Sequence, residues 1–258
     1  MRFRSNTADN WELNWTKSEL QSQNYRKSVW DVINEIKFGY LRRLIPSGGL
    51  CLEVGCGIES LLNSIAGLGW NGVGIDYSPT ALKLAHIRLI NTQQQVDLIR
   101  GNAYNLPFRN QSFDLVMSTG LLEHFRYPQP IVKEMIRVLR PGGIFYSDIV
   151  PRKFSLLRAL DNIKWSSKEK LGLENIFERR FSKVEIEKML YEMRTLENLS
   201  VFPAGVFPPR KLFSKRIMFT SFAEYPVSKV FGLLSSVLDG TWVAELLGFY
   251  YFVIGTKS

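Results

Sequence analysis

The sequence has few cysteines, few histidines and no long apolar run, and each shortage excludes a class of protein. Its two cysteines, Cys51 and Cys56, cannot build a disulfide framework and are too few to hold a structural zinc ion. The longest stretch without a charged residue, Ser60–Ile75, is shorter than the ~20 apolar residues of a membrane-spanning helix. The first residues, Met1–Thr7, lack the apolar segment of a secretory signal. We therefore expect a cytoplasmic protein without a metal site.

The composition is that of a folded protein with an excess of basic residues. Hydrophobic residues make up 45% of the 258 residues and charged residues 22%, which excludes a disordered or fibrous chain. The formal net charge of +9 comes from the two ends of the chain, since basic and acidic residues balance over 46–149. Such an excess suits an anionic substrate, a nucleic acid or an acidic membrane surface, and equally a solvated basic surface.

Strand-like and helical segments alternate from Leu50 to Ile149. Short apolar runs predict strands at 50–54, 72–75, 96–99, 113–118 and 144–150. Helices are predicted at 61–66, after the capping pair Ser78-Pro79, and at 131–139, where Arg140-Pro-Gly-Gly ends the helix. Alternation of this kind predicts an α/β fold with a doubly wound parallel sheet, because each crossover places a helix on one face of the sheet.

The segment before this core reads as helical. We take the chain as a single domain, 1–258, whose core spans 49–150, and we expect residues 1–48 to form a helical lid. A stripe of apolar residues supports a helix here, and it consists of Val29, Val32, Ile33 and Ile36.

The segment after the core, 151–258, has a different rhythm. A basic helix is predicted at 155–170, and the pair Ser182 and Glu185 forms a capping box at the start of another helix. Two further strands are predicted, at 196–202 and 249–257. The residues between them, 203–247, are too many for a hairpin loop, so we interpret them as a helical insertion on the substrate side.

The first predicted strand ends in a glycine-containing loop. Gly55 and Gly57 follow the strand and precede a helix, and Asp76 stands at the end of the next strand. Such glycines let the backbone approach a ligand closely, and the acid can accept both hydroxyls of a ribose. This pattern predicts a nucleoside cofactor. A dinucleotide enzyme fits less well, because Ser60 stands where its third small residue is expected.

Further segments follow in an order that carries a resemblance. They are Glu53-Val-Gly-Cys-Gly, Gly74-Ile-Asp-Tyr-Ser, Gly101-Asn-Ala-Tyr-Asn-Leu-Pro-Phe, Ser112-Phe-Asp-Leu-Val, Leu121-Leu-Glu-His-Phe and Arg137-Val-Leu-Arg-Pro-Gly-Gly. Together they resemble the class I S-adenosylmethionine-dependent methyltransferases, in the branch that acts on small molecules and lipids. The resemblance covers 50–150 closely and the last two strands loosely. It implies a seven-stranded Rossmann-like sheet with an antiparallel last strand.

The resemblance also implies roles for individual residues. The methionine part of S-adenosylmethionine would be bordered by Glu53, Gly55, Cys56 and Gly57, and Thr119, within Ser118–Leu121, would lie under the sulfonium. The nucleoside part would be held by Asp76 at the ribose, by Tyr77 beside the adenine, and by Asn102 with the amide of Ala103 at the adenine edge. Asn102 stands where the family more often has Asp, and its amide oxygen can still accept a hydrogen bond.

Two positions keep alternatives open. Glu59 stands where the family usually has a third glycine, and its carboxylate could repel the cofactor or instead point outward and favour the helix N-terminus. For His124, at the mouth of the cleft, we favour a structural role, and a general base is the alternative. His86 and Cys51 read as structural. The aromatic residues Trp11, Trp15, Tyr25 and Trp30 could cover the site or only anchor the first helix.

The sequence gives least information about the methyl acceptor. A nucleic acid is disfavoured, because Ser118-Thr-Gly-Leu replaces the Asn/Asp-Pro-Pro-aromatic motif of the amino-methylating nucleic-acid enzymes. We expect a small-molecule or lipid-like acceptor. Apolar stretches at 217–222 and 230–238 stand beside Lys and Arg residues, which leaves room for a peripheral membrane contact. A non-catalytic relative and a nucleotide-dependent oxidoreductase remain as alternatives.

Overall fold

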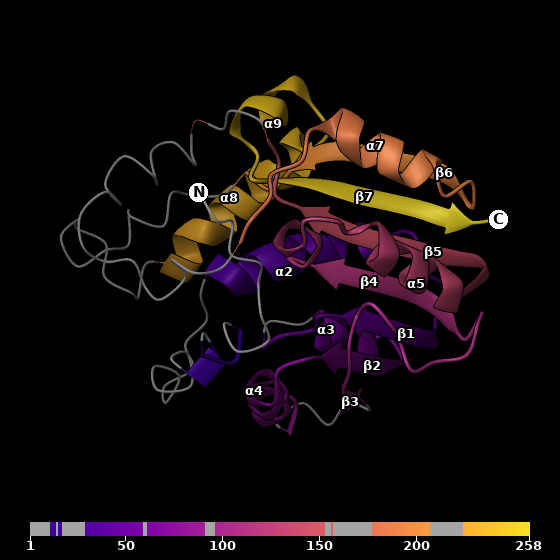
Figure 1. The fold of residues 1–258 in the computed structure, drawn as a ribbon. Helices are drawn as coiled ribbons and strands as arrows, with labels where there is room; N and C mark the ends of the chain where they lie inside the picture. The colour runs from indigo at the N-terminus through magenta and orange to yellow at the C-terminus, as the bar shows by residue number, and fades with distance from the viewer. Residues whose placement is uncertain are drawn as a thin grey trace.

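The computed structural model describes residues 11–13, 15–16, 29–58, 61–90, 96–152, 156, 177–206 and 224–258. Their centre is one mixed sheet of seven strands in the order β3-β2-β1-β4-β5-β7-β6. The strands are β1 Gly49–Val54, β2 Trp70–Asp76, β3 Val96–Arg100, β4 Phe113–Thr119, β5 Leu139–Ile149, β6 Leu196–Ala204 and β7 Tyr250–Lys257. Strands β1 to β5 are parallel, whereas β7 runs antiparallel to both β5 and β6 (Figure 1). This is the predicted doubly wound fold with a reversed last strand.

Helices cover both faces of the sheet. They are α2 Val29–Leu41, α3 Leu62–Ala66, α4 Pro79–Ile90, α5 Gln129–Val138, α7 Lys183–Tyr191, α8 Glu224–Leu238 and α9 Trp242–Leu247, with a short 3-10 turn at Leu122–His124. Neighbouring residues of β1 point to opposite sides, as a strand requires. Leu52 packs in a cluster that includes residues of α5 and α7, and Cys51 packs in a second cluster with α3 and the end of α2.

Local signals explain where two of these helices begin. Ser78 Oγ accepts a hydrogen bond from the Ala81 N–H at 3.0 Å, and Pro79 occupies the first helical position of α4. Ser182 and Glu185 form the predicted capping box at the start of α7. Both starts are confirmed.

One boundary was wrong. The sequence predicts a helix to Leu139 and a loop at Arg140-Pro-Gly-Gly, but α5 ends at Val138 and β5 already begins at Leu139. Leu139 pairs with Phe113 of β4, and the register then shifts before Ile144 pairs with Leu115. A proline and two glycines are tolerated in this strand because they lie at the irregularity, where ladder hydrogen bonds are interrupted.

The second half of the insertion is mostly helical. Strand β6 runs to Ala204, two residues into the segment assigned to the insertion, and α8 and α9 fill most of its second half. The basic helix predicted at 155–170 and the apolar stretch 217–222 lie outside the described residues, apart from Leu156 in the former. No helix within the described ranges is long and apolar enough to cross a membrane.

Candidate functional site

The loop after β1 has the backbone shape that the glycines predict. Gly55 and Gly57 have φ angles of +70° and +48°, a region that other residues rarely enter. A Cβ atom on Gly55 would lie 2.5 Å from Leu121 Cδ1, so a side chain there would require the Leu121 side chain to move. The N–H groups of Gly55 and Cys56 both donate to the Ile75 carbonyl, at 2.8 and 3.1 Å. The loop is therefore fixed against the end of β2.

Asp76 joins this loop to the next helix. Its Oδ2 accepts a hydrogen bond from the Gly57 N–H at 2.9 Å, and its Oδ1 accepts one from the Ser78 N–H at 2.9 Å. Burial raises the pKa of Asp76 above its ordinary value, although these two N–H donors oppose the shift. Each carboxylate oxygen can accept a second hydrogen bond, so the pair can also receive two hydroxyl donors.

Glu53 braces the floor of the same region. Its fully buried carboxylate accepts a hydrogen bond from Thr119 Oγ1 at 2.9 Å and another from the Leu61 N–H at 3.1 Å. These bonds connect β1 with the end of β4 and with the start of α3. Two predicted site residues, Glu53 and Thr119, are thus brought together directly.

The residues assigned to the adenine follow the next two strands. Tyr77 is half exposed, and the Arg100 guanidinium lies 5.7 Å from the centre of its ring. Asn102 stays next to Asp76 in space, because the Gly101 N–H donates to the Asp76 carbonyl. Asn102 Oδ1 accepts from the Tyr104 N–H at 2.9 Å and forms a local turn that contains Ala103. The amide of Asn102 is therefore held in place at the surface.

His124 has contacts of a structural kind. Its Nδ1 donates to the Phe177 carbonyl at 3.0 Å, since a carbonyl can only accept. The ring also meets Trp11 edge-on, with centroids 4.8 Å apart. Burial lowers the pKa of His124 below its ordinary value. These contacts agree with the structural interpretation, and a role as general base stays a prediction.

A buried group of charges at the ends of β4 and β5 was missed by the sequence analysis. Lys37 on α2 lies 2.9 Å from Asp148 Oδ2, and Asp148 Oδ1 accepts from the Gly120 N–H at 3.0 Å. Glu123, in the turn after β4, is also buried, and its Oε2 has no hydrogen-bond partner among the described residues. Burial, with Asp148 nearby, raises the pKa of Glu123 to about 8. A signal was present, since Lys37 continues the apolar stripe of α2 at the spacing of Val29 and Ile33.

Residues 11–13 and 15–16 lie over the glycine loop. Trp15 would be 3.3 Å from a Cβ atom on Gly57, and its ring stacks on Trp11 with centroids 6.2 Å apart. Glu12 accepts hydrogen bonds from the hydroxyls of Ser78 and Thr80 at the start of α4. Two of the predicted aromatic residues therefore cover the site.

The other candidate residues lie elsewhere or are not described. Tyr25, Glu59 and Ser60 are outside the described residues, as is the side chain of Trp30. Cys51 and Cys56 are buried, and burial raises the pKa of both thiols, that of Cys51 to about 12. Neither is therefore a thiolate at neutral pH. His86 is exposed on α4, away from these residues.

The comparisons with known proteins agree with this geometry. Residues 52–147 match the family described as a methyltransferase domain. This match identifies residues 52–147 as a methyltransferase domain, in agreement with the resemblance of the sequence to the class I S-adenosylmethionine-dependent enzymes. A ubiquinone biosynthesis O-methyltransferase from Xanthomonas axonopodis pv. citri is 33% identical over 129 residues, which is 48% of this chain and 54% of that protein. The chain thus spans about half the length of the curated relatives it matches.

Solved structures share the methyltransferase fold at lower identity. A possible histamine N-methyltransferase from Thermotoga maritima has a TM-score of 0.63 at 21% identity, covering 98% of this chain and 100% of that one. A Haemonchus contortus phosphoethanolamine N-methyltransferase, in complex with S-adenosylhomocysteine, has a TM-score of 0.57 at 17% identity, covering 87% of this chain and 52% of that one. These likenesses concern the fold. They do not favour the oxidoreductase alternative.

The cofactor of this methyltransferase is S-adenosylmethionine, and the residues present fit it. The cofactor has a ribose but no phosphate. Asp76 retains acceptor capacity for two hydroxyls, and Gly55 and Gly57 leave the backbone of the adjoining loop without side chains. The fit is thus one of a carboxylate that can accept a diol next to a loop that carries no side chains at Gly55 and Gly57.

Proposed function

We propose that the protein transfers a methyl group to an oxygen atom of a small, lipid-like acceptor. The observation that carries the proposal is the arrangement of Asp76 and Gly57, whose hydrogen bond joins a carboxylate that can accept a diol to the glycine loop. The choice of oxygen is supported by the curated relatives, which are named O-methyltransferases. The choice of a small acceptor rests on the same relatives and on the absence of a nucleic-acid motif after β4.

The residues that would hold the cofactor follow from the site. Asp76 would accept the ribose hydroxyls, with Tyr77 and the turn of Asn102 and Ala103 at the adenine. The loop from Gly55 to Gly57, including Cys56, would border the methionine part, with Thr119 on its other side. When bound, S-adenosylmethionine supplies a methyl group on a sulfonium, which is already a good leaving group. Orientation is therefore the main task of these residues.

Methyl transfer to a hydroxyl also needs a group near the acceptor that can take up the hydroxyl proton. A hydroxyl must lose its proton when its oxygen gains a methyl group. Glu123 fits this task by position, since it is buried in the turn that follows β4 and its Oε2 has a free acceptor site among the described residues. Below its pKa of about 8 the carboxyl is protonated, and above it the carboxylate can accept a proton. His124, the neighbouring residue, remains the second candidate for this role.

Lys37 and Asp148 would determine the electrostatic environment of Glu123. The ammonium of Lys37 is paired with Asp148, which also holds the Gly120 N–H in the segment after β4. The pair thereby fixes the backbone that leads to Glu123. We assign both residues a positioning role.

A transfer assay tests the proposal. The protein is incubated with S-adenosylmethionine labelled in its methyl group and with phenols that carry alkyl chains of increasing length, beside alkyl amines and transfer RNA. We expect label in the phenols, with better acceptors among the longer chains, and no label with Asp76→Ala. Labelling of amines or RNA alone would contradict the oxygen acceptor. Binding of the cofactor without transfer to any of them would favour the non-catalytic alternative.

A further inference from the structure

Helix α8 exposes its apolar side and buries a serine. Val230, Leu233, Leu234 and Val237 follow the spacing of one helix face, and all four are exposed, Leu233 to 72% and Val237 to 75%. Ser235 on the opposite face is completely buried. A helix of a globular protein normally shows the reverse pattern. The apolar face, which we call the α8 stripe, is thus unusual for a surface in water.

The inverted orientation of α8 is fixed by polar contacts. Ser235 Oγ accepts from the Val206 N–H at 3.0 Å and donates to Asp239. Asp239 in turn accepts from the Gly205 N–H at 2.9 Å and from the Tyr40 hydroxyl at 2.7 Å. These bonds tie the end of α8 to the end of β6 and to α2. Rotating the helix to bury the stripe would break all of them.

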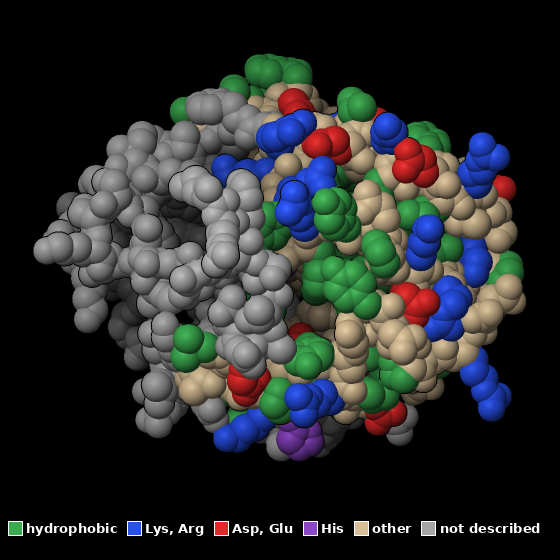
Figure 2. Space-filling model, in the orientation of Figure 1, with side chains coloured by type: hydrophobic (Ala, Val, Ile, Leu, Met, Phe, Trp, Pro, Cys, Tyr) green, Lys and Arg blue, Asp and Glu red, His purple; other side chains and the backbone are tan. Residues whose placement is uncertain are grey.

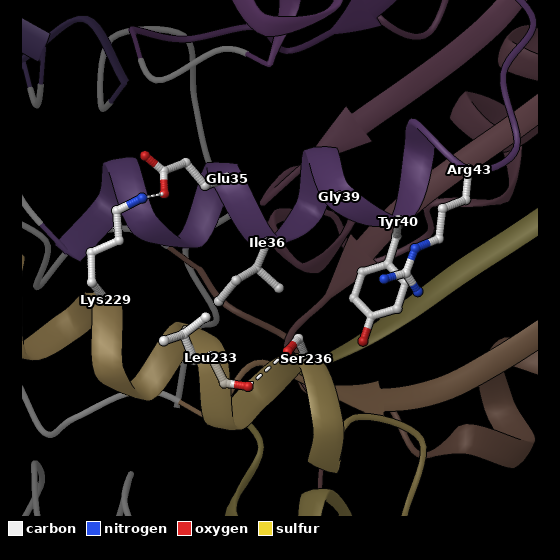
Figure 3. Close-up of a pocket in the computed structure, with 9 residues that line it drawn as sticks. Glu35, Ile36, Gly39, Tyr40, Arg43, Lys229, Leu233 and Ser236 are labelled. Carbon is white, nitrogen blue, oxygen red and sulfur yellow. Dashed lines mark hydrogen bonds and ion pairs between the residues drawn. The ribbon is translucent and has the colours of Figure 1, made fainter.

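Contacts with α2 hold the helix on its other flank. A groove of about 220 Å³ separates α2 from α8, and Ile36 and Leu233 face each other across it (Figure 3). Lys229 forms an ion pair with Glu35 at one end of the groove, and Tyr40 and Arg43 lie at the other. Leu233 therefore stands at the rim of this groove, and the rest of the α8 stripe points away from it.

Helix α9, which contacts α8, also exposes apolar residues. Trp242 is 78% exposed and Leu246 is also exposed, and hydrophobic side chains protrude over α9 in Figure 2. The acidic residues of this region are engaged by neighbours, since Glu245 accepts from the Tyr251 hydroxyl at 2.7 Å and Asp239 is bonded as above. The surface thus combines aliphatic residues and a tryptophan, with its acids held in hydrogen bonds.

The α8 stripe also lies at the functional end of the molecule. Helix α8 is placed at the end of the sheet toward which β4 and β5 point, and this is the end that carries the glycine loop and Glu123 (Figure 1). The sequence immediately before α8 is basic, with Arg210, Lys211, Lys215 and Arg216. A ligand taken from a surface under α8 would therefore arrive near the site.

We propose that the α8 stripe, with Trp242, docks on the surface of an anionic lipid bilayer. Aliphatic residues and a tryptophan suit the boundary between headgroups and acyl chains. The net charge of +9 and the cations before α8 favour an acidic leaflet. The same charge opposes a second copy as the occupant, because two such chains repel each other. This proposal does not depend on the acceptor named above, since it concerns adsorption of the protein.

Vesicle flotation with a matched pair of variants tests the proposal. Val237→Glu places a charge in the stripe, and Val184→Glu makes the same change on α7, where Val184 is exposed to a similar degree, 71%. Both positions are solvent-exposed, so both variants should keep the melting temperature of the wild type. We expect the wild type and Val184→Glu to float with vesicles of phosphatidylcholine and phosphatidylglycerol at low salt. The affinity of Val237→Glu for these vesicles should be lower than that of the wild type by about tenfold or more.

Additional measurements identify the surface to which the protein binds. Binding should weaken with added salt and be much weaker to vesicles of phosphatidylcholine alone. Brominated acyl chains should quench tryptophan fluorescence in the wild type, and Trp242→Phe should remove part of that quenching. A wild type that stays in the dense fraction would overturn the proposal, as would equal losses in the two valine variants. If Val237→Glu instead converts a wild-type dimer to a monomer, a second copy is the occupant.

Discussion

Lys37 and Asp148 form an ion pair of 2.9 Å between α2 and the end of β5, and both side chains are almost completely buried. Burial by itself would lower the pKa of Lys37, but Asp148, together with Tyr250 and Glu53, outweighs it, and the pKa lies above its ordinary value. The pair connects the N-terminal helix to the sheet at the site. Since the pKa of Lys37 is raised, the ion pair stabilises the folded protein at neutral pH, and this stabilisation is lost only in strong alkali.

Removing one partner of this pair should be costly. Lys37→Met leaves the Asp148 carboxylate buried without a counter-charge, and we expect the free energy of unfolding to fall by ~3–5 kcal/mol. Urea unfolding followed by circular dichroism measures the change. The double variant with Asp148→Asn should recover much of the loss. As a control, Lys183→Met removes an exposed pair with Glu187 and should have little effect. Equal effects of the two lysine variants would contradict this account.

Glu123 should make stability fall as the pH rises. Its carboxyl pKa is raised from 4.5 to about 8, because burial and the nearby Asp148 disfavour the charged form. The folded protein therefore holds this proton more tightly than the unfolded chain does. The resulting stabilisation of the folded state is complete below pH ~4.5 and is lost as the pH rises from ~4.5 to ~8. Glu123→Gln keeps a neutral group. Its unfolding free energy, measured by urea at several pH values, should decline less over this range than that of the wild type.

A wild type and Glu123→Gln with parallel pH profiles would show that Glu123 is ionised at neutral pH. In that case Glu123 would be a permanent charge beside Lys37, and the proton-accepting role proposed for it would need another residue.

Glu12 should control how long the cofactor product stays bound. Its bonds to Ser78 and Thr80 hold Glu12 and its described neighbours over the glycine loop, next to Asp76. We expect Glu12→Ala to release S-adenosylhomocysteine several-fold faster, because the cover over Gly57 is loosened. Stopped-flow tryptophan fluorescence measures the rate. Glu35→Ala removes an exposed carboxylate that pairs with Lys229 on the α2–α8 groove and serves as the control. Unchanged release in Glu12→Ala would mean that residues 11–16 do not retain the ligand.

The sequence predicted the core better than the parts around it. Strands β1 to β4 were predicted because apolar runs of buried parallel strands are local signals, and the places of Gly55, Gly57 and Asp76 at the ends of β1 and β2 were predicted because their spacing follows from one strand–loop–helix unit. The start of β5 was wrong because its pairing with β4 overrides the local signal of a proline and two glycines.

Long-range contacts could not be predicted. Lys37 and Asp148 are far apart in the sequence, and neither residue alone indicates an ion pair. The outward face of α8 was also hidden, since an apolar stripe normally indicates burial, and only the bonds of Ser235 and Asp239 show which side faces inward. Local patterns thus predicted the loop after β1, whereas tertiary contacts decide which sides of α2 and α8 face the core.

The most direct test of the account is the binding of S-adenosylhomocysteine by isothermal titration, with NAD and NADP titrated beside it. We expect the wild type to bind S-adenosylhomocysteine and neither dinucleotide, and the ligand to raise the melting temperature, because it binds only the folded state. Asp76→Ala should remove most of the affinity and of the shift in melting temperature, since it deletes the acceptors for the ribose hydroxyls. Binding of NAD alone, or equal affinities of the wild type and Asp76→Ala for S-adenosylhomocysteine, would contradict the account.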